Sequence, residues 1–553
     1  MLAKENIITI NELPDLSDLD RFNEFLIQIK ADDLLPTIDI LKASGLEVYE
    51  NEGHVIVYYV TAYNKHKILE LTDNSINIFP PTSRLVPLYF RELDNVFYLT
   101  NVVENLIPYK SELHVSSFAC AVNLSRHWAP YNHFFNDIAC LTPLCRYKLV
   151  GGELKLLNLM VDRQGVTIDE TLDVIYEQYD KIFDANNHVF IFITGGFDSR
   201  ANLALARHFS KKYNNKITLV RCDFLFSGRK NKGESQDHLI STLLAEKCKY
   251  DLLNFKVDPL ILDEFKKILY TDERFIKMNP TITRPSTAFY YLVFNYIKNN
   301  YKDSVIIANQ TDCHKGIGYD LVQEIKQDYH LLGAASEKYV KYINNYFGIP
   351  YEAGFQNDYV DDVFKRSDKF DLYGQIDYFH YETFNSCIGP ARAIWQNLFD
   401  TPFPFLDERF IAKIFNLAPE YKKDAFIPKE LIRRLSPDLL GPEFNSGSNK
   451  MYRKRRKYAE FVEKVFVKMG LIIDNLINKN KVIRKISNAM VEDTQWAAIS
   501  FETKNTAIKK MIDYCSIYKR NPKNISVFAT QLTAIKLAYI EKNLRVKIIF
   551  DSK

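Results

Sequence analysis

The stretch HVFIFITGGFDSRANLALAR, residues His188 to Arg207, decides how the chain is interpreted. A short apolar run ends in Thr-Gly-Gly, and a helix-forming run rich in Ala and Leu follows. This pattern predicts a buried strand, a tight turn and a helix. At such a turn the N–H groups of the first helical residues point past the end of the strand and attract anions, phosphate above all. The stretch therefore predicts an anion site at which glycines let a ligand approach the backbone closely.

Two polar residues after the glycines make this prediction more specific. The carboxylate of Asp198 would repel a phosphate unless a cation lies between them, and Mg²⁺ can bridge carboxylate and phosphate oxygens. The hydroxyl of Ser199 can donate to a phosphate oxygen. A second interpretation stays open, in which Asp198 or Ser199 only caps the helix, because short glycine motifs are weak evidence. The stretch is neither a Gly-Lys-Ser/Thr phosphate loop nor a GxGxxG fingerprint.

The sequence on both sides of this turn alternates between apolar strands and helices. Such alternation predicts an α/β fold with a doubly wound parallel sheet. The expected segments are a helix over 168–183, a strand over 188–194, a helix over 201–213, a strand over 216–222, a helix over 233–248 and a strand over 303–309. The turn then lies beyond the carboxyl end of a strand, where open α/β sheets bind their ligands.

The first 165 residues have a different pattern. Candidate Asp and Ser caps, as in LPDLSDLDRFNEFLIQI over 13–29, predict short helices up to about residue 45. From there to about Leu157, short β-rich runs between polar breaks predict a mainly antiparallel sheet. We therefore expect an α+β domain over 1–165, an α/β domain over 166–450 and a helical extension over 451–553.

The composition limits the class of protein. With 553 residues the chain exceeds one ordinary core, and a net charge of +3 is too small to indicate a nucleic-acid partner. No apolar run reaches the length of a membrane helix, and the N-terminus lacks the apolar core of a signal peptide. The eight cysteines form no CxxC pair, which argues against a zinc ribbon or a dithiol motif. These features predict a soluble, cytoplasmic protein without membrane or nucleic-acid partners.

Several motifs together resemble those of one superfamily. ITGGFDSRANLA resembles the pyrophosphate loop Ser-Gly-Gly-x-Asp-Ser of the N-type ATP pyrophosphatases, within the asparagine synthetase-like superfamily that includes β-lactam synthetases and lasso-peptide cyclases. The other motifs follow in the order of that superfamily: SRLVPLYFRELDNVFYLTNVVENL (83–106), PLCRYKLVGGELKLL (143–157), GESQDHLISTLLAEKC (233–248), TITRPSTAFYYL (281–292), IIANQTDCHKGIGY (306–319) and TPFPFLDERFIAKIFNLAPEYK (401–422). The resemblance covers about residues 50 to 450.

The resemblance implies a fold for each half of the chain. Residues 166–450 would form an asparagine synthetase-like ATP pyrophosphatase domain of the adenine nucleotide α-hydrolase-like type. Residues 1–165 would form a degenerate Ntn-hydrolase-like domain, the glutaminase of the superfamily. Its nucleophile is the cysteine after the initiator methionine, but Leu2 stands there and the first cysteine is Cys120. We therefore expect this domain to persist as a scaffold without glutaminase activity.

The resemblance also implies a reaction and its participants. The expected enzyme is an AMP-forming carbon–nitrogen ligase that uses ATP and Mg²⁺ to adenylate a substrate carboxylate, releases pyrophosphate and passes the acyl group to an amine. The carboxylate would belong to a small molecule or a peptide. A homodimer or a biosynthetic partner protein is a further expectation.

The same resemblance assigns residues to roles. Asp198 and Asp312 would hold Mg²⁺. The catalytic set would be Asp198, Asp312, Arg284, His314 and Lys315. The nucleotide-binding set would be Thr194, Gly195, Gly196, Phe197, Asp198, Ser199, Arg200 and Cys222. Arg200 places a positive charge against the helix dipole, which favours a phosphate or carboxylate contact, although an ordinary exposed arginine is an equal alternative.

Some positions depart from the superfamily. Asn309 and Cys313 replace two acids of the second loop, and no lysine is in register with the late-loop lysine, which leaves Lys315, Lys429 and Lys450 as alternatives. The alternative function is therefore a catalytically impaired, nucleotide-binding partner protein of a biosynthetic complex. A tRNA-modifying pyrophosphatase is a third and weaker alternative.

Overall fold

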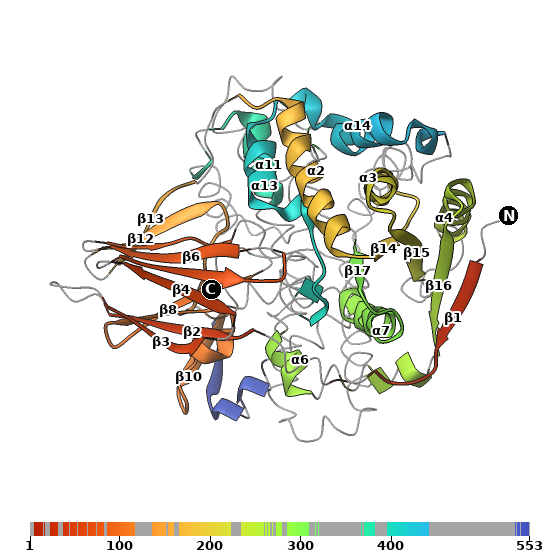
Figure 1. Cartoon of the computed structure of the whole chain (residues 1–553). Coiled ribbons are helices and arrows are strands. Elements are labelled where there is room, and N and C mark those ends of the chain that lie inside the picture. The colour runs from red at the N-terminus through yellow and green to blue at the C-terminus, as the bar shows by residue number, and fades with distance from the viewer. Residues whose placement is uncertain are drawn as a thin grey trace, which may run out of the picture.

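The computed structural model places a parallel sheet beside two antiparallel sheets (Figure 1). The residues that it describes are 5–14, 16, 23–30, 37–43, 45–51, 54–63, 65–72, 75–81, 86–116, 135, 137–150, 153–159, 165–222, 234–258, 260–262, 264–265, 268, 272–278, 285–308, 316, 319, 366–367, 370–381, 395–396, 398–441, 537, 539–541 and 543–551.

The parallel sheet has five strands in the order β1-β16-β15-β14-β17. Its strands are β1 (Glu5–Ile10), β14 (His188–Phe192), β15 (Lys216–Cys222), β16 (Asp251–Val257) and β17 (Ser304–Ile307). The described helices between them are α3 (Phe197–Tyr213), α4 (Glu234–Cys248), α6 (Glu273–Met278) and α7 (Pro285–Asn300), and α2 (Ile168–Ala185) precedes β14. The predicted strand–helix alternation is confirmed, and β16 is a strand that the sequence did not predict.

Both faces of this sheet are covered. Val189 and Ile191 of β14 pack into a buried apolar cluster with residues of α2, α3 and α4. Phe190 and Phe192 point the other way and pack with α7. This alternation explains why the strand is apolar throughout, as strands of a doubly covered parallel sheet are. Figure 1 shows α2, α3 and α4 on one side of the sheet and α7 on the other.

The chain changes direction in the sheet between β14 and β17. From β14 it proceeds through β15 to β16 on one side, and β17 then returns to the other side of β14. The segments that leave these two adjacent strands therefore diverge at their shared carboxyl edge. In open α/β sheets this switch point opens the crevice in which ligands bind.

Two antiparallel sheets lie beside this unit. One has the order β11-β8-β9-β2-β3 and the other β13-β12-β7-β6-β5-β4. They pack face to face, and the rings of Phe25 on β2 and Tyr59 on β5 lie 5.8 Å apart. The strands are β2 (Phe25–Lys30), β3 (Thr37–Ala43), β4 (Leu46–Asn51), β5 (His54–Val60), β6 (Lys65–Thr72), β7 (Ser75–Ile78), β8 (Tyr89–Leu93), β9 (Val96–Thr100), β11 (Ala139–Cys140), β12 (Cys145–Val150) and β13 (Glu153–Leu159).

The prediction of short helices before residue 45 is wrong for the described residues. β1, β2 and β3 occupy this region. The burial of β2 alternates residue by residue, which matches the alternation of Phe, Ile and Ile with Leu, Gln and Lys in FLIQIK. The two-residue period of a strand therefore outweighs the Asp and Ser residues that suggested helix caps.

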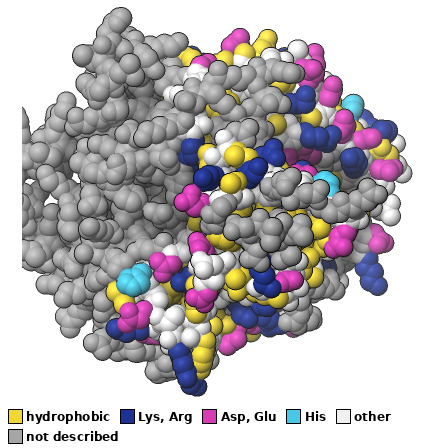
Figure 2. Space-filling view, turned by 90° about the vertical axis from the view of Figure 1, so that its left-hand side faces the viewer, with side chains coloured by type: hydrophobic (Ala, Val, Ile, Leu, Met, Phe, Trp, Pro, Cys, Tyr) yellow, Lys and Arg dark blue, Asp and Glu magenta, His cyan; other side chains and the backbone are white. Residues whose placement is uncertain are grey.

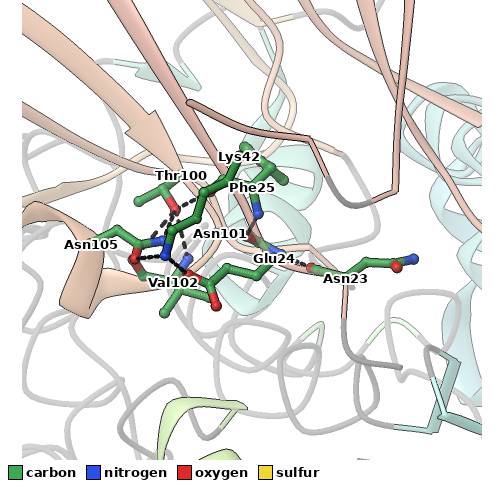
Figure 3. Close-up of polar contacts among 8 residues, drawn as sticks. All are labelled: Asn23, Glu24, Phe25, Lys42, Thr100, Asn101, Val102 and Asn105. Carbon is green, nitrogen blue, oxygen red and sulfur yellow. Dashed lines mark hydrogen bonds and ion pairs between the residues drawn. The ribbon is translucent and has the colours of Figure 1, made fainter. Parts of the chain in front are cut away.

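A polar cluster fastens the start of β2 to the end of β9 (Figure 3). Asn101 accepts a hydrogen bond from the Phe25 N–H at 2.9 Å and donates to the Asn23 carbonyl at 2.6 Å. The Thr100 hydroxyl donates to the Phe25 carbonyl, and Lys42 of β3 contacts Glu24. The cluster satisfies backbone groups where the strand enters the buried sheet, as buried backbone groups require.

The two ends of the chain cross over between these units. β1 pairs with β16 at the edge of the parallel sheet that lies away from the antiparallel sheets (Figure 1). β18 (Lys547–Asp551) pairs in parallel with β10 (Glu112–Ser116). The limits 1–165, 166–450 and 451–553 stay a prediction, but these two strands do not follow them. The expectation of a helical extension up to the C-terminus is wrong for 547–551.

Candidate functional site

The predicted turn lies at the switch point of the parallel sheet. Thr194, Gly195 and Gly196 link the end of β14 to α3, and the Ile193 N–H donates to the Val220 carbonyl of β15 at 2.9 Å. The end of β17 lies on the other side of β14. The sequence therefore placed the turn correctly, at the carboxyl edge where ligands of such sheets bind.

Hydrogen bonds within the turn fix its shape. The Thr194 N–H donates to Ser199 Oγ at 3.1 Å, and this hydroxyl lies 3.0 Å from the Thr194 carbonyl oxygen. Thr194 Oγ1 accepts from the Gly196 N–H at 3.3 Å. Ser199 is 1% exposed, so its hydroxyl serves the turn itself in this conformation. Its predicted contact with a phosphate would require a change of partner and stays a prediction.

Gly196 stands at the N-terminus of α3 as its N-cap residue. Its φ is −82°, which any residue adopts, and no side chain caps the helix. Of the residues that the structure describes, a Cβ at this position would meet only Thr194 Oγ1, at an ordinary contact distance of 3.5 Å. Neither the backbone conformation nor packing therefore requires glycine here. A ligand that approaches the first N–H groups of α3 would require it.

Asp198 lies in the first turn of α3 and is half-buried. A carboxylate in the first turn interacts favourably with the helix dipole, so its position is compatible with capping as well as with metal binding. Across the described parts of the chain, no three His, Cys, Asp or Glu side chains gather closely enough to hold a metal ion. Asp312, the expected second ligand, lies outside these residues, so the Mg²⁺ site stays a prediction.

A lysine reaches the turn from a helix that the sequence did not place there. α14 (Phe426–Leu435) packs along α3, and Lys429 Nζ lies 4.9 Å from the centre of the Phe197 ring. Of the three lysines left open by the sequence, Lys429 is the one that the structure describes. Its ammonium group adds a positive charge beside the N-terminus of α3, and a cation over an aromatic ring is itself stabilised.

Arg200, for which the sequence predicted a phosphate or carboxylate contact, lies in the interior beside the glycine turn. Its side chain is completely buried and donates to the Leu439 carbonyl at 3.2 Å and to the Gly195 carbonyl at 3.5 Å. Burial lowers the pKa of this guanidinium to about 10. Arg200 is therefore not the exposed arginine of the alternative interpretation, and its phosphate or carboxylate contact stays a prediction. It fixes the backbone of the glycine turn against η8 (Pro437–Leu440).

Asn202 joins three elements of the site and was missed by the sequence analysis. Its Nδ2 donates to the Ala308 carbonyl at 3.5 Å, directly after β17, and its Oδ1 accepts from the Tyr179 hydroxyl at 2.9 Å. Asn202 is fully buried. The sequence signal for such a role is a polar residue within the apolar run of α3, because a buried amide needs hydrogen-bond partners.

The remaining site predictions have two outcomes. Cys222 is buried at the carboxyl end of β15, at the same edge of the sheet as the turn. Arg284, Asp312, His314 and Lys315 lie outside the described residues. The structure thus brings residues 194–200 and Cys222 to one edge of the sheet and leaves the other four as predictions.

Comparisons with known proteins add no assignment. No protein-family model matches the chain, and no curated protein matches its sequence.

Figure 2 shows Lys and Arg side chains interspersed with Asp and Glu on one face of the described part of the molecule. Among the described helices, none is long and apolar enough to span a membrane.

Proposed function

We propose that the protein is an ATP-dependent, amide-forming ligase that adenylates a carboxylate and transfers the acyl group to an amine. The observation that carries this proposal is the Thr194–Ser199 turn at the switch point of the sheet. There, an α-helix begins at a glycine without a side-chain cap, Asp198 follows in its first turn and Lys429 lies beside it. Such a helix N-terminus suits the phosphates of a nucleotide.

In this proposal each described residue has a defined task. The N–H groups at Gly196 and the start of α3 would bind the pyrophosphate part of ATP, and Lys429 would neutralise part of its charge. Asp198 would hold Mg²⁺, together with Asp312 by resemblance. A bound Mg²⁺ supplies charge neutralisation at the phosphate oxygens. Arg200 and Asn202 would keep the turn in place through their buried contacts.

The reaction follows from the charges that change. The substrate carboxylate attacks the α-phosphorus of ATP, pyrophosphate leaves, and the amine then displaces AMP to form the amide. The positive groups at the turn stabilise the leaving pyrophosphate, which is where negative charge develops. By resemblance, the amine would not come from a glutaminase reaction of this chain, because Leu2 stands in place of the nucleophilic cysteine of the superfamily.

Pyrophosphate release tests the proposal. The protein is incubated with ATP, Mg²⁺ and pools of carboxylates, with and without amines. We expect carboxylate-dependent release that falls at least about 100-fold in Asp198→Asn, because the variant loses the carboxylate that would hold the charge-neutralising Mg²⁺. The matched control is Asp173→Asn, which neutralises an exposed carboxylate of α2.

Other outcomes have distinct meanings. Mg²⁺-dependent binding of ATP without release of pyrophosphate from any pool would favour the impaired, nucleotide-binding partner protein. The replacement of two acids by Asn309 and Cys313 is the sequence feature that supports this alternative. Absence of ATP binding would contradict both functions. If Asp173→Asn also lost pyrophosphate release, the loss in Asp198→Asn could not be assigned to the glycine turn.

A further inference from the structure

Three buried polar side chains form a cluster outside the glycine turn, which we call the buried triad. Lys422 Nζ lies 2.5 Å from Asp377 Oδ2, and the Tyr319 hydroxyl donates to the same oxygen at 2.6 Å. The exposed fractions are 1% for Lys422, 4% for Asp377 and 3% for Tyr319. Burial raises the pKa of Tyr319, so its hydroxyl keeps the proton that it donates.

The triad joins segments that are far apart in the sequence. Asp377 lies on α11 (Leu372–His380), and Lys422 lies between η6 (Pro419–Tyr421) and η7 (Lys423–Ala425). Tyr319 belongs to the segment that follows β17, and its ring packs on Tyr373 of α11 at 4.8 Å. The segment after β17 is thereby attached to α11 and to the chain at Lys422.

Gly316 lies in close contact with Tyr319 and Lys422 of the buried triad. Its φ is +60°, and a Cβ would lie 2.9 Å from the Tyr319 ring and 3.1 Å from the Lys422 carbonyl carbon. The backbone at Gly316 therefore packs directly against the backbone at Lys422. Position 316 tolerates only glycine, because both the left-handed conformation and the close approach exclude a side chain.

The start of the same segment is also held. The Ala308 carbonyl, directly after β17, accepts from Asn202 of α3, the helix that begins at the glycine turn. Ala308 is thus bonded to the helix of the candidate site, and Tyr319 is held by the triad. A buried ion pair stabilises a protein little compared with apolar residues of the same size. It does require a precise geometry, so it is suited to hold segments in position.

We infer that Tyr319, Asp377 and Lys422 are positioning residues, which fix the backbone at Gly316 and Tyr319 against α11 and Lys422 in the place that the reaction at the glycine turn requires. The inference rests on the proposed ligase function. The triad acts through backbone position and does not touch ATP. Loss of the Tyr319 hydroxyl then lowers kcat more than it raises the KM for ATP, because misplaced groups slow the reaction step.

The test compares Tyr319→Phe with wild type and with Tyr147→Phe. The control removes another buried tyrosine hydroxyl, which accepts from the Thr142 N–H at 3.0 Å in the antiparallel sheets. We expect kcat for pyrophosphate release to fall about tenfold or more in Tyr319→Phe, at a Tm similar to that of the control. A kcat within twofold of wild type overturns the inference, whereas an inactive wild type contradicts the proposed function instead.

Hydrogen exchange gives a readout that does not depend on activity. Amide exchange is followed in peptides that cover 316–319 and, for comparison, β14. We expect Tyr319→Phe to raise exchange at 316–319 and to leave β14 protected, as local loosening does. Unchanged exchange at 316–319 overturns the inference, and equal loosening of β14 overturns it too, because the hydroxyl would then support the whole unit.

Discussion

Gly196 and Gly316 each follow a strand of the parallel sheet along the chain, yet they differ in what requires them. Gly316 has a positive φ and meets the Tyr319 ring, so the fold needs it. Gly196 has an ordinary φ, and among the described residues its missing Cβ would make only an ordinary contact with Thr194. A glycine that the fold does not need is best explained by something that approaches it from outside.

This contrast gives a prediction for Gly196→Ala. We expect the free energy of unfolding to change by less than about 1 kcal/mol, because alanine fits this backbone. The affinity for Mg²⁺ and ATP should fall about tenfold or more, since the methyl group stands before the N–H groups of α3. Calorimetric binding and thermal unfolding measure the two quantities.

Gly316→Ala is the matched comparison and should show the reverse order of effects. Its main result should be a loss of stability, at least about 1 to 2 kcal/mol from the left-handed backbone alone. If Gly196→Ala bound nucleotide as tightly as wild type, the glycine turn would be a structural feature only.

His188 gives the molecule a defined response to acid. Its Nε2 lies 2.8 Å from the Thr218 hydroxyl, and burial, together with the nearby Lys216 charge, lowers the pKa of His188 to about 4. An unfolded histidine titrates near pH 6.5, so between about pH 6.5 and 4 the unfolded chain binds more protons than the folded one. His188 therefore contributes a loss of stability as the pH falls through this window.

The variant His188→Gln isolates that contribution. Glutamine keeps a hydrogen-bonding group near Thr218 and has no proton to gain. We expect the Tm of wild type to fall more between pH 7 and pH 5 than the Tm of His188→Gln, measured by calorimetry at both pH values. Equal losses in the two proteins would show that other groups determine the acid response.

At the scale of elements, α2 offers the clearest test of local sequence signals. Thr167 accepts from the Glu170 N–H at 3.2 Å, and the Glu170 carboxylate accepts from the Thr167 N–H at 2.8 Å, which completes a capping box. This helix leads directly into β14 and covers one face of the parallel sheet. Its N-terminus thus supports the strand that carries the glycine turn.

Removal of this cap should have a moderate cost. We expect Thr167→Ala to lower the free energy of unfolding by about 1 kcal/mol, while Thr167→Ser keeps the hydroxyl and changes it little. Chemical denaturation of the three proteins measures the difference. A loss in Thr167→Ser equal to that in Thr167→Ala would assign the effect to the threonine methyl group instead of the cap.

The sequence predicts elements well where the signal is local. β14, α3 and β15 follow from apolar runs and the glycine turn, and the antiparallel strands follow from short alternating runs. The helix expected within 13–29 is wrong for 25–29, because cap-like residues were given more weight than the alternation of FLIQIK. β16 was not predicted, since Asn254 and Lys256 interrupt its apolar pattern.

The candidate site divides in the same way. The turn itself is a local feature and could be predicted, as could Asp198 in the first turn of α3. The contacts of Arg200 with Leu439 and of Lys429 with Phe197 join residues distant in sequence, and no periodicity reports on them. The resemblance supplied Lys429 only as one of three alternatives, and the structure places it beside the turn.

At the scale of the whole molecule, each unit is completed by a strand from the opposite end of the chain. β1 extends the parallel sheet, and Ile10 is 7% exposed within its core. β18 pairs with β10, and Val546 is buried against the N-terminal unit. A cut near residue 165 would therefore separate two strands from their sheets.

Truncation measures how much β1 contributes. We expect deletion of residues 1–11 to raise amide exchange along β16, because that strand becomes the edge of the sheet and loses its hydrogen-bonded neighbour. Deletion of residues 1–4 alone, which leaves β1 intact, is the control. Exchange along β16 that equals wild type in both deletions would contradict a stabilising role for β1.

The crossing of the two ends also sets an order of events during synthesis. β1 leaves the ribosome before β16, and at usual translation rates about 12 to 50 seconds pass between Ile10 and its neighbour β16. β10 waits longer, because β18 is separated from it by more of the chain than β16 is from β1. Until then, both units carry strand edges that can pair with other chains. Cellular yield of this protein should therefore respond to chaperones that bind nascent chains more than its final stability would suggest.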